Sequence, residues 1–188
     1  MTCTALASRM FRLAALLAAG ALSACGSGGP SAGPNLAASS YHPGLACAPF
    51  ARELSGIALY GDAYTWWMAA TGRYVQAARP QIGAVLVLRR SDRLPHGHVA
   101  VVSRLLAARQ MLVIQANWVA NEVTEDQLVV DVSPANDWTE LRMWWPPTGQ
   151  LGSHTYAAYG FILPPSPATH EALRRAAQPA ALLAENGR

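Results

Sequence analysis

Residues 98–118, HVAVVSRLLAARQMLVIQANW, decide the fold class of this chain. They contain two short apolar runs, His98–Val102 and Met111–Gln115, that are rich in β-branched residues and separated by a polar connection. This pattern is typical of two strands joined by a hairpin. Similar short runs occur at 84–88, 128–132, 141–145 and 159–163. The region after Pro80 is therefore predicted to form an antiparallel sheet.

Helical spacing occurs ahead of these strands. Phe50, Leu54 and Ile57 follow one another at steps of four and three residues, and Gly56 supplies a stop signal. The pattern predicts a short helix with Cys47 at its N-terminal end. The unpaired N–H groups of a helix N-terminus favour a thiolate over a thiol, so this position suits a reactive cysteine.

A second helix is predicted over 63–70, with Asp62 as its N-cap and Gly72 as its end. Residues 165–188 are expected to be a Pro-containing C-terminal tail, in which 169–185 form a short peripheral Ala- and Leu-rich helix broken at Pro179 or are partly disordered. Because helices precede a series of strands, we expect an α+β fold in which the N-terminal helices pack on an antiparallel β-sheet.

Composition narrows the class of protein further. The 188 residues are 52% hydrophobic and 13% charged, which suits a single domain with one core and excludes a wholly disordered chain. The formal net charge is +3, but without residues 1–24 it is +1, from 12 Arg against 11 Asp and Glu; this charge gives no basic footprint, so no nucleic-acid partner is expected. We expect a monomer.

The N-terminal segment has the features of an export signal. Residues 1–24 combine two arginines with an uncharged run, 13–22, that is too short to span a bilayer. The tetrapeptide Leu22-Ser-Ala-Cys25 resembles a bacterial lipobox, in which the cysteine is lipidated; the alternative is an ordinary signal peptide with an incidental cysteine. Residues 25–40 resemble a flexible tether. The lipobox resemblance implies a sorting rule in which Asp after the cysteine favours the inner membrane; because Gly26 stands there, we expect the outer membrane, with the domain facing the periplasm.

Three cysteines are present: Cys3 would leave with the signal, Cys25 would be acylated and Cys47 would remain unpaired. A lone thiol in an oxidising compartment is a liability unless it has a function, so Cys47 is a candidate nucleophile. The alternative is a small buried hydrophobic residue.

The candidate base is His98, which begins a strand, and His96 on the preceding loop is its competitor. Gln115 and Asn117 end the next strand and, by alternation, should face the same side of the sheet. Either amide oxygen could accept the Nδ1–H of His98, which would leave Nε2 to take the thiol proton. Trp118 is expected to shield this site.

Six blocks of sequence, in order, resemble the CHAP domain, a cysteine, histidine-dependent amidohydrolase/peptidase, over about residues 41–164. The blocks are Cys47-Ala-Pro-Phe-Ala-Arg52, Ser55-Gly-Ile57, Gly61-Asp-Ala63, Gly83-Ala-Val-Leu-Val87, His96-Gly-His-Val-Ala-Val-Val102 and Gln115-Ala-Asn-Trp118. The resemblance implies a papain-like fold and cleavage of an amide bond in peptidoglycan, with Cys47 as nucleophile and His98 as base.

The chain departs from the family pattern at two places. The family often has Glu where this sequence has Gln115, which removes a charge beside the imidazole. Some members carry acidic residues before the cysteine for calcium, but residues 41–46 contain none, so we expect no metal and no cofactor. Tyr41 and the backbone N–H of Cys47 are candidate oxyanion donors.

The sequence therefore favours a lipid-anchored peptidoglycan hydrolase. Three alternatives stay open: an NlpC-type endopeptidase, an amidase acting on a small amide outside the wall, and a lipoprotein that binds the wall with little or no catalytic activity. An intact Cys47 and His98 pair favours an enzyme over a binder.

Overall fold

The computed structural model describes residues 45–186. The chain divides into two compact units, residues 1–37 and 38–188, and all the described residues belong to the second. The predicted signal peptide and tether, Cys25 and Tyr41 lie outside the described residues. Within that described part, no helix is long and apolar enough to cross a membrane.

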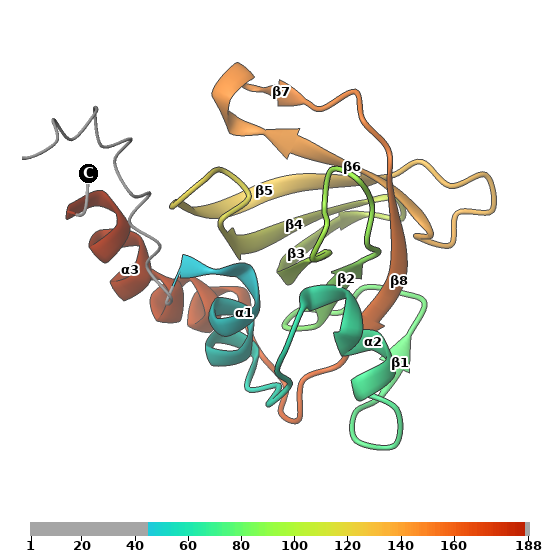
Figure 1. Ribbon diagram of the computed structural model, residues 1–188, viewed down its shortest axis with the longest axis horizontal. Coiled ribbons are helices and arrows are strands. Elements are labelled where there is room, and N and C mark those ends of the chain that lie inside the picture. The colour runs from blue at the N-terminus through green and yellow to red at the C-terminus, as the bar shows by residue number, and fades with distance from the viewer. Residues whose placement is uncertain (1–44, 187–188) are drawn as a thin grey trace, which may run out of the picture. The chain divides into compact units, whose positions relative to one another are not determined.

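In residues 45–186, six antiparallel strands close into a barrel (Figure 1). The order around the barrel is β8-β2-β3-β4-β5-β6, and β6 pairs with β8 again to complete it. The short strands β1 and β7 pair with β8 and β6. The strands are β1 (Gln76–Ala77), β2 (Val85–Leu88), β3 (His98–Ala107), β4 (Gln110–Ala116), β5 (Val123–Asp131), β6 (Glu140–Trp145), β7 (Gln150–Leu151) and β8 (Tyr156–Ile162).

The expected papain-like α+β fold, with N-terminal helices packed on an antiparallel β-sheet, was therefore wrong, although the six apolar runs do contribute to strands. The barrel closes because β8 pairs with both β2 and β6. Its first residues pair with β6 and its later residues with β2. The register of β8 and β2 shifts between Val87 and Leu88, and Gly160 in β8 has a φ of 137°. Such irregularities increase local twist and help a sheet to curl on itself.

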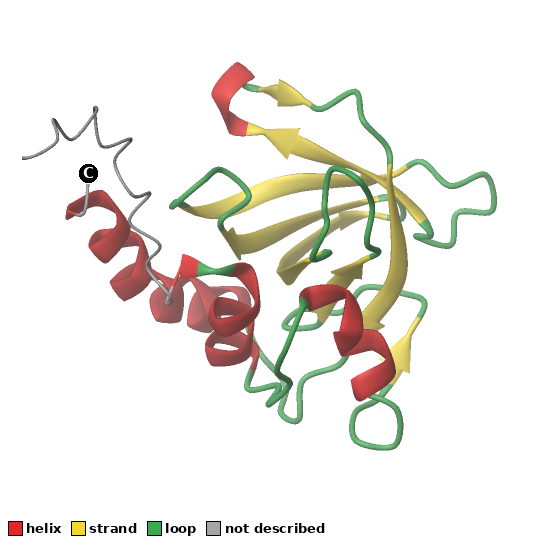
Figure 2. Cartoon of the chain, viewed as in Figure 1, coloured by secondary structure: helices red, strands yellow, loops and turns green. Residues whose placement is uncertain are grey.

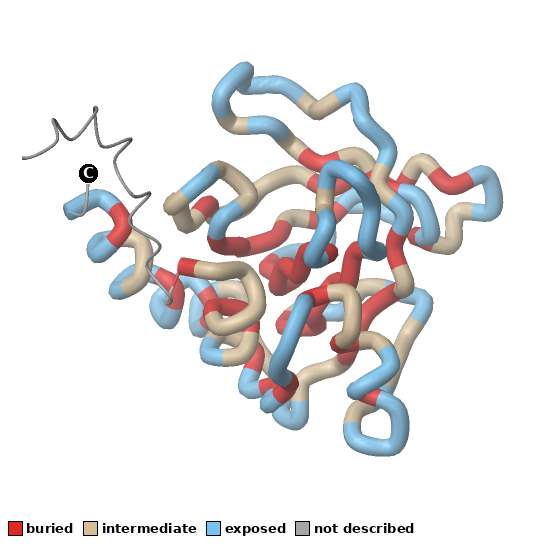
Figure 3. Tube along the Cα trace, viewed as in Figure 1, coloured by how far each residue is buried: buried red, intermediate tan, exposed pale blue. Residues whose placement is uncertain are grey.

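Closure creates two hydrophobic clusters, one on each face of the barrel wall. In β2, Leu86 and Leu88 belong to the cluster that includes Met143 and Phe161, whereas Val85 and Val87 belong to the one that includes helical residues. All four β2 residues are buried, and Figure 3 shows buried segments along β2, β3 and β4. The uninterrupted apolar runs in the sequence reflect this burial on both faces.

The helices lie outside the barrel (Figure 2). They are α1 (Cys47–Ser55), α2 (Trp66–Ala69) and α3 (His170–Asn186), with 3-10 turns η2 (Ala63–Thr65) and η3 (Pro146–Thr148). The prediction for α1 is confirmed: Gly56 takes a φ of 72° and its N–H bonds to the carbonyl of Arg52. This left-handed conformation is the usual reason for a glycine at a helix C-terminus.

The other two helices differ from expectation. The predicted helix over 63–70 is divided into η2 and α2, and Asp62 makes no side-chain cap. α3 continues through Pro179 and is not broken there. Its buried residues Leu173, Ala177 and Ala184 anchor it, and it contacts α1 and β5. This packing opposes the local cost of the proline, which removes one helical hydrogen bond.

Candidate active site

Cys47 is the first residue of α1, and its side chain is half-buried. Phe50 and Ala51, both buried, fix the helix against the outer face of the barrel wall, where α1 contacts β3 and β4. This packing brings the N-terminus of α1 to the beginning of β3, where His98 lies. The placement of the thiol at a helix N-terminus agrees with the prediction from sequence.

The thiol of Cys47 is hydrogen-bonded to the side chain of His98 and to the backbone N–H groups of Val99 and Ala48. Burial raises the pKa of the Cys47 thiol, but the charge of His98 and these hydrogen bonds together outweigh burial. The pKa of Cys47 therefore falls below its ordinary value. A lowered pKa is the property that separates a reactive cysteine from an inert buried one.

His98 is held by a second hydrogen bond, from the opposite side of its ring. Its Nε2 lies 2.9 Å from Oε1 of Gln115, and both side chains are buried. Because an amide oxygen only accepts, Nε2 carries the proton and Nδ1 is left for the thiol. The predicted roles of the two ring nitrogens were thus reversed. Among the described residues, Nε2 of Gln115 has no hydrogen-bond partner.

Asn117 does not share this contact. It has a φ of 61°, so the regular alternation of β4 ends before it, and its side chain is exposed. Its Oδ1 accepts the N–H of Asn121 at 3.0 Å, which closes the turn that leads into β5. Asn117 lines the same cavity as Cys47 and His98, but of the two amides Gln115 is the one that bonds to His98.

Trp118 covers the edge of the imidazole. The rings of Trp118 and His98 are 5.0 Å apart between centroids and tilted by 58°. The indole N–H donates to the carbonyl of Trp144 at 3.0 Å, which fixes the ring in that position. An aromatic ring held in this way limits the access of water to His98.

A cavity of about 550 Å³ opens at the thiol. It is lined by Cys47 and His98 together with residues that the sequence did not single out as a group, among them Arg52, Asp62 and Arg93. They belong to loops and a helix that are distant in sequence, so no local pattern marks them. Arg52 lies over the ring of Tyr60, with its guanidinium carbon 4.6 Å from the centroid.

His96, the competing candidate base, lies at this cavity but has a different partner. Its Nδ1 is 3.2 Å from Oδ1 of Asp62, and both side chains are exposed. The group that Cys47 contacts is His98. In the part of the chain that the structure covers, no group of three or more His, Cys, Asp or Glu side chains could hold a metal ion.

The comparison with protein families agrees with this geometry. Residues 37–117 match the family model described as CHAP domain, a span that includes Cys47, His98, Gln115 and Asn117. No curated protein matches the chain. CHAP domains are amidase- or peptidase-type hydrolases that act on peptidoglycan. Residues 37–117 of this chain are therefore similar to a CHAP domain.

Proposed function

We propose that this protein is a cysteine-dependent amidase or endopeptidase that cuts an amide bond of bacterial peptidoglycan. One observation carries the proposal: the Cys47 thiol, His98 and Gln115 form a continuous hydrogen-bonded series that opens into a cavity. A nucleophile, a base and a group that orients the base are the parts that covalent amide hydrolysis requires.

In the first step, Nδ1 of His98 takes the proton of the Cys47 thiol and the sulfur attacks the amide carbonyl. A sulfur–carbon bond forms, and the carbonyl oxygen becomes an oxyanion. The first N–H groups of α1 have no intrahelical acceptor, so the N–H of Cys47 is a suitable donor to that oxygen. The protonated His98 then gives its proton to the leaving nitrogen as the carbon–nitrogen bond breaks.

In the second step, water attacks the thioester. His98 accepts a proton from the water, the carbon–sulfur bond breaks, His98 returns the proton to the departing sulfur of Cys47, and the carboxylic acid product leaves. Throughout both steps, Oε1 of Gln115 accepts the Nε2–H and holds the ring with Nδ1 toward the sulfur. A neutral amide orients the imidazole but adds no negative charge to stabilise the imidazolium.

The direct test digests purified sacculi with the full-length chain and identifies the new end groups by mass spectrometry. We expect paired amine and carboxyl ends, which are absent with Cys47→Ala. His170→Ala is a matched control because it removes a different hydrogen-bonded imidazole. Binding to sacculi without new ends would overturn the proposal in favour of a wall-binding lipoprotein.

We also propose that Cys25 anchors the protein to the cell envelope by lipidation, with the domain facing the periplasm. The support is the lipobox-like tetrapeptide that ends at Cys25. Cys25→Ser should move the protein from the membrane fraction to the soluble fraction while its activity on sacculi is kept. Firm membrane association of Cys25→Ser would contradict the anchor.

A further inference from the structure

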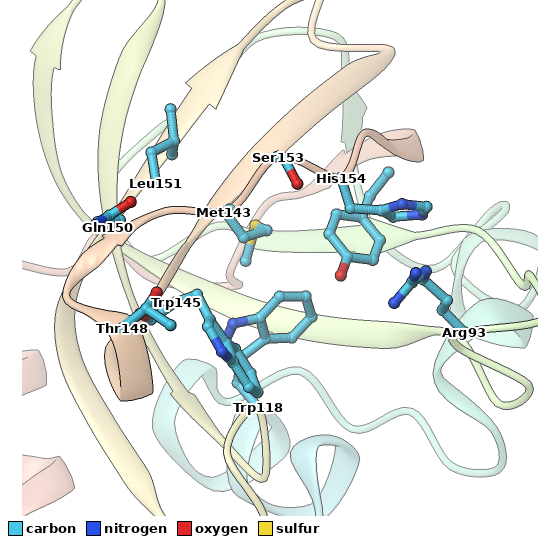
Figure 4. Close-up of a pocket in the computed structure, with 11 residues that line it drawn as sticks. Arg93, Trp118, Met143, Trp145, Thr148, Gln150, Leu151, Ser153 and His154 are labelled. Carbon is cyan, nitrogen blue, oxygen red and sulfur yellow. The ribbon is translucent and has the colours of Figure 1, made fainter.

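A second cavity, of about 530 Å³, lies beside the candidate active site (Figure 4). Figure 4 shows Arg93 at one end, Gln150 and Leu151 at the other, and Trp118 with Met143 between them. Its lining residues are Arg93, Trp118, Met143, Trp145, Thr148, Gln150, Leu151, Gly152, Ser153, His154 and Tyr156. All of these except Arg93 come after residue 117, where the family match ends.

The two cavities adjoin each other. Arg93 lines both of them, and the consecutive residues Asn117 and Trp118 line one each. The Trp118 ring also packs against His98, so this one side chain lies between the reacting groups and the second cavity. A ligand whose amide lies at Cys47 and which passes Trp118 would enter the second cavity.

The lining has the chemistry of a sugar site. Trp145 is 38% exposed and its ring meets that of Trp118 edge to face, which offers a flat apolar surface to the C–H face of a pyranose. Thr148, Gln150 and Ser153 provide short polar groups for hydroxyl and acetamido substituents. Pockets that combine aromatic walls with a few placed polar groups are typical of small-ligand sites.

The charge of the lining also restricts which ligands suit the second cavity. The lining of the second cavity contains no Asp or Glu, and Arg93 places a cation where the two cavities meet. Burial raises the pKa of the Tyr156 phenol, and the charge of Arg93 partly opposes this effect, so the field of Arg93 reaches the cavity. A carboxylate on the peptide part of the ligand would suit this position.

We propose that the second cavity binds a sugar ring of the glycan, so that the amide cut at Cys47 is the one that joins peptide to sugar. This inference rests on the proposed function and makes it more specific. It excludes a cut inside the peptide stem, for which the second cavity would have to hold amino-acid residues.

The experiment measures binding separately from catalysis. The Cys47→Ala chain, which cannot cut, is titrated by calorimetry with the peptide-free disaccharide of N-acetylglucosamine and N-acetylmuramic acid, and in parallel with the free stem peptide. We expect the disaccharide to bind, and Trp145→Ala in the same background to weaken binding about tenfold, because a stacked aromatic contact is lost.

Trp144→Ala is the matched control. Trp144 neighbours Trp145 in β6 but does not line the cavity, because alternate residues of a strand face opposite sides. Trp144→Ala should leave the affinity for the disaccharide within about twofold of that of the Cys47→Ala chain, because a substitution outside the site has only a small effect on binding. Equal losses in both variants would overturn the inference, since they would indicate a general effect on β6.

The remaining outcomes separate this inference from the proposed function. If the stem peptide binds in place of the disaccharide, or if neither binds, the sugar site is overturned. If sacculi yield new ends within the stem, the proposed function stands and the position of the cut is wrong. If the disaccharide binds through Trp145 but sacculi yield no ends, the sugar site stands while hydrolysis and the cut are overturned.

Discussion

Two histidines of this molecule make side-chain hydrogen bonds of nearly equal length, in very different settings. Nε2 of His98 lies 2.9 Å from Gln115, and Nε2 of His170 lies 3.0 Å from Asp126. Asp126 also accepts the hydroxyl of Ser103 at 2.9 Å. Serine, aspartate and histidine are thus gathered at one place, and cysteine, histidine and glutamine at another.

The order of the groups separates these two places. At His98 the imidazole lies between the nucleophile and the amide, so it can move a proton. At His170 the carboxylate lies between the imidazole and the hydroxyl, so the histidine cannot act on the serine through this arrangement. Ser103 is also fully buried. The cluster around Asp126 links α3 to the barrel, and the residue types alone do not define a catalytic site.

The largest difference is expected between removing the Cys47 thiol and removing the Ser103 hydroxyl. Cys47→Ala should lower the rate of end-group release from sacculi by at least about 10³-fold, because the covalent route is lost. Ser103→Ala should keep the rate close to that of the unmodified chain. Comparable losses in the two variants would remove the distinction between the clusters.

Substitutions of the groups that hold the two histidines should differ less in their effect on kcat. Gln115→Ala frees the imidazole and should lower kcat about 10–100-fold, within the range seen for general acid–base groups. Gln115→Glu should retain activity, because a carboxylate accepts the same Nε2–H and stabilises the imidazolium. Asp126→Asn should leave kcat unchanged. If Asn117→Ala is severely impaired while Gln115→Ala is nearly neutral, the orienting role passes to Asn117.

A smaller effect is expected at Asn117, whose contribution we attribute to its backbone. Asn117→Gly keeps the left-handed conformation and should retain most activity, whereas Asn117→Ala should destabilise the fold by about 1 kcal/mol. Chemical denaturation and kcat/KM measure the two quantities. If Asn117→Gly loses activity while its free energy of unfolding is kept, the side chain would have a direct role.

The smallest expected effect is on stability alone. His170→Ala removes a half-buried hydrogen bond and should lower the free energy of unfolding by about 0.5–1.5 kcal/mol without changing kcat. Thermal and urea unfolding provide the measurement. A loss of activity in a folded His170→Ala protein would contradict this prediction and indicate that α3 contributes to catalysis.

Much of this fold was predictable wherever local patterns decide it. Short apolar runs marked the strands, and the spacing of Phe50 and Leu54 with Gly56 marked α1. The closure of the barrel was not predictable, because it depends on β8 pairing with both β2 and β6. No single segment of sequence contains that information.

At the candidate site, too, some features were predictable from sequence and others depend on the folded structure. The residue types at Cys47, His98 and Gln115, with their places on α1, β3 and β4, were sufficient to group them. The choice between the ring nitrogens depends on how the imidazole is turned, and the role of Asn117 depends on one backbone angle. Arg93 joins the site through a loop, so only the structure identifies it.

The most direct test of the central claim, that His98 activates Cys47, is the pH dependence of alkylation by iodoacetamide, followed by mass spectrometry at the Cys47 peptide of the full-length chain. A lowered pKa means that the thiolate persists as the pH falls to that value and is lost only below it. We predict an inflection below the ordinary thiol pKa that moves upward in His98→Ala and stays in His170→Ala. An inflection at or above the ordinary value, unchanged by His98→Ala, would contradict the account.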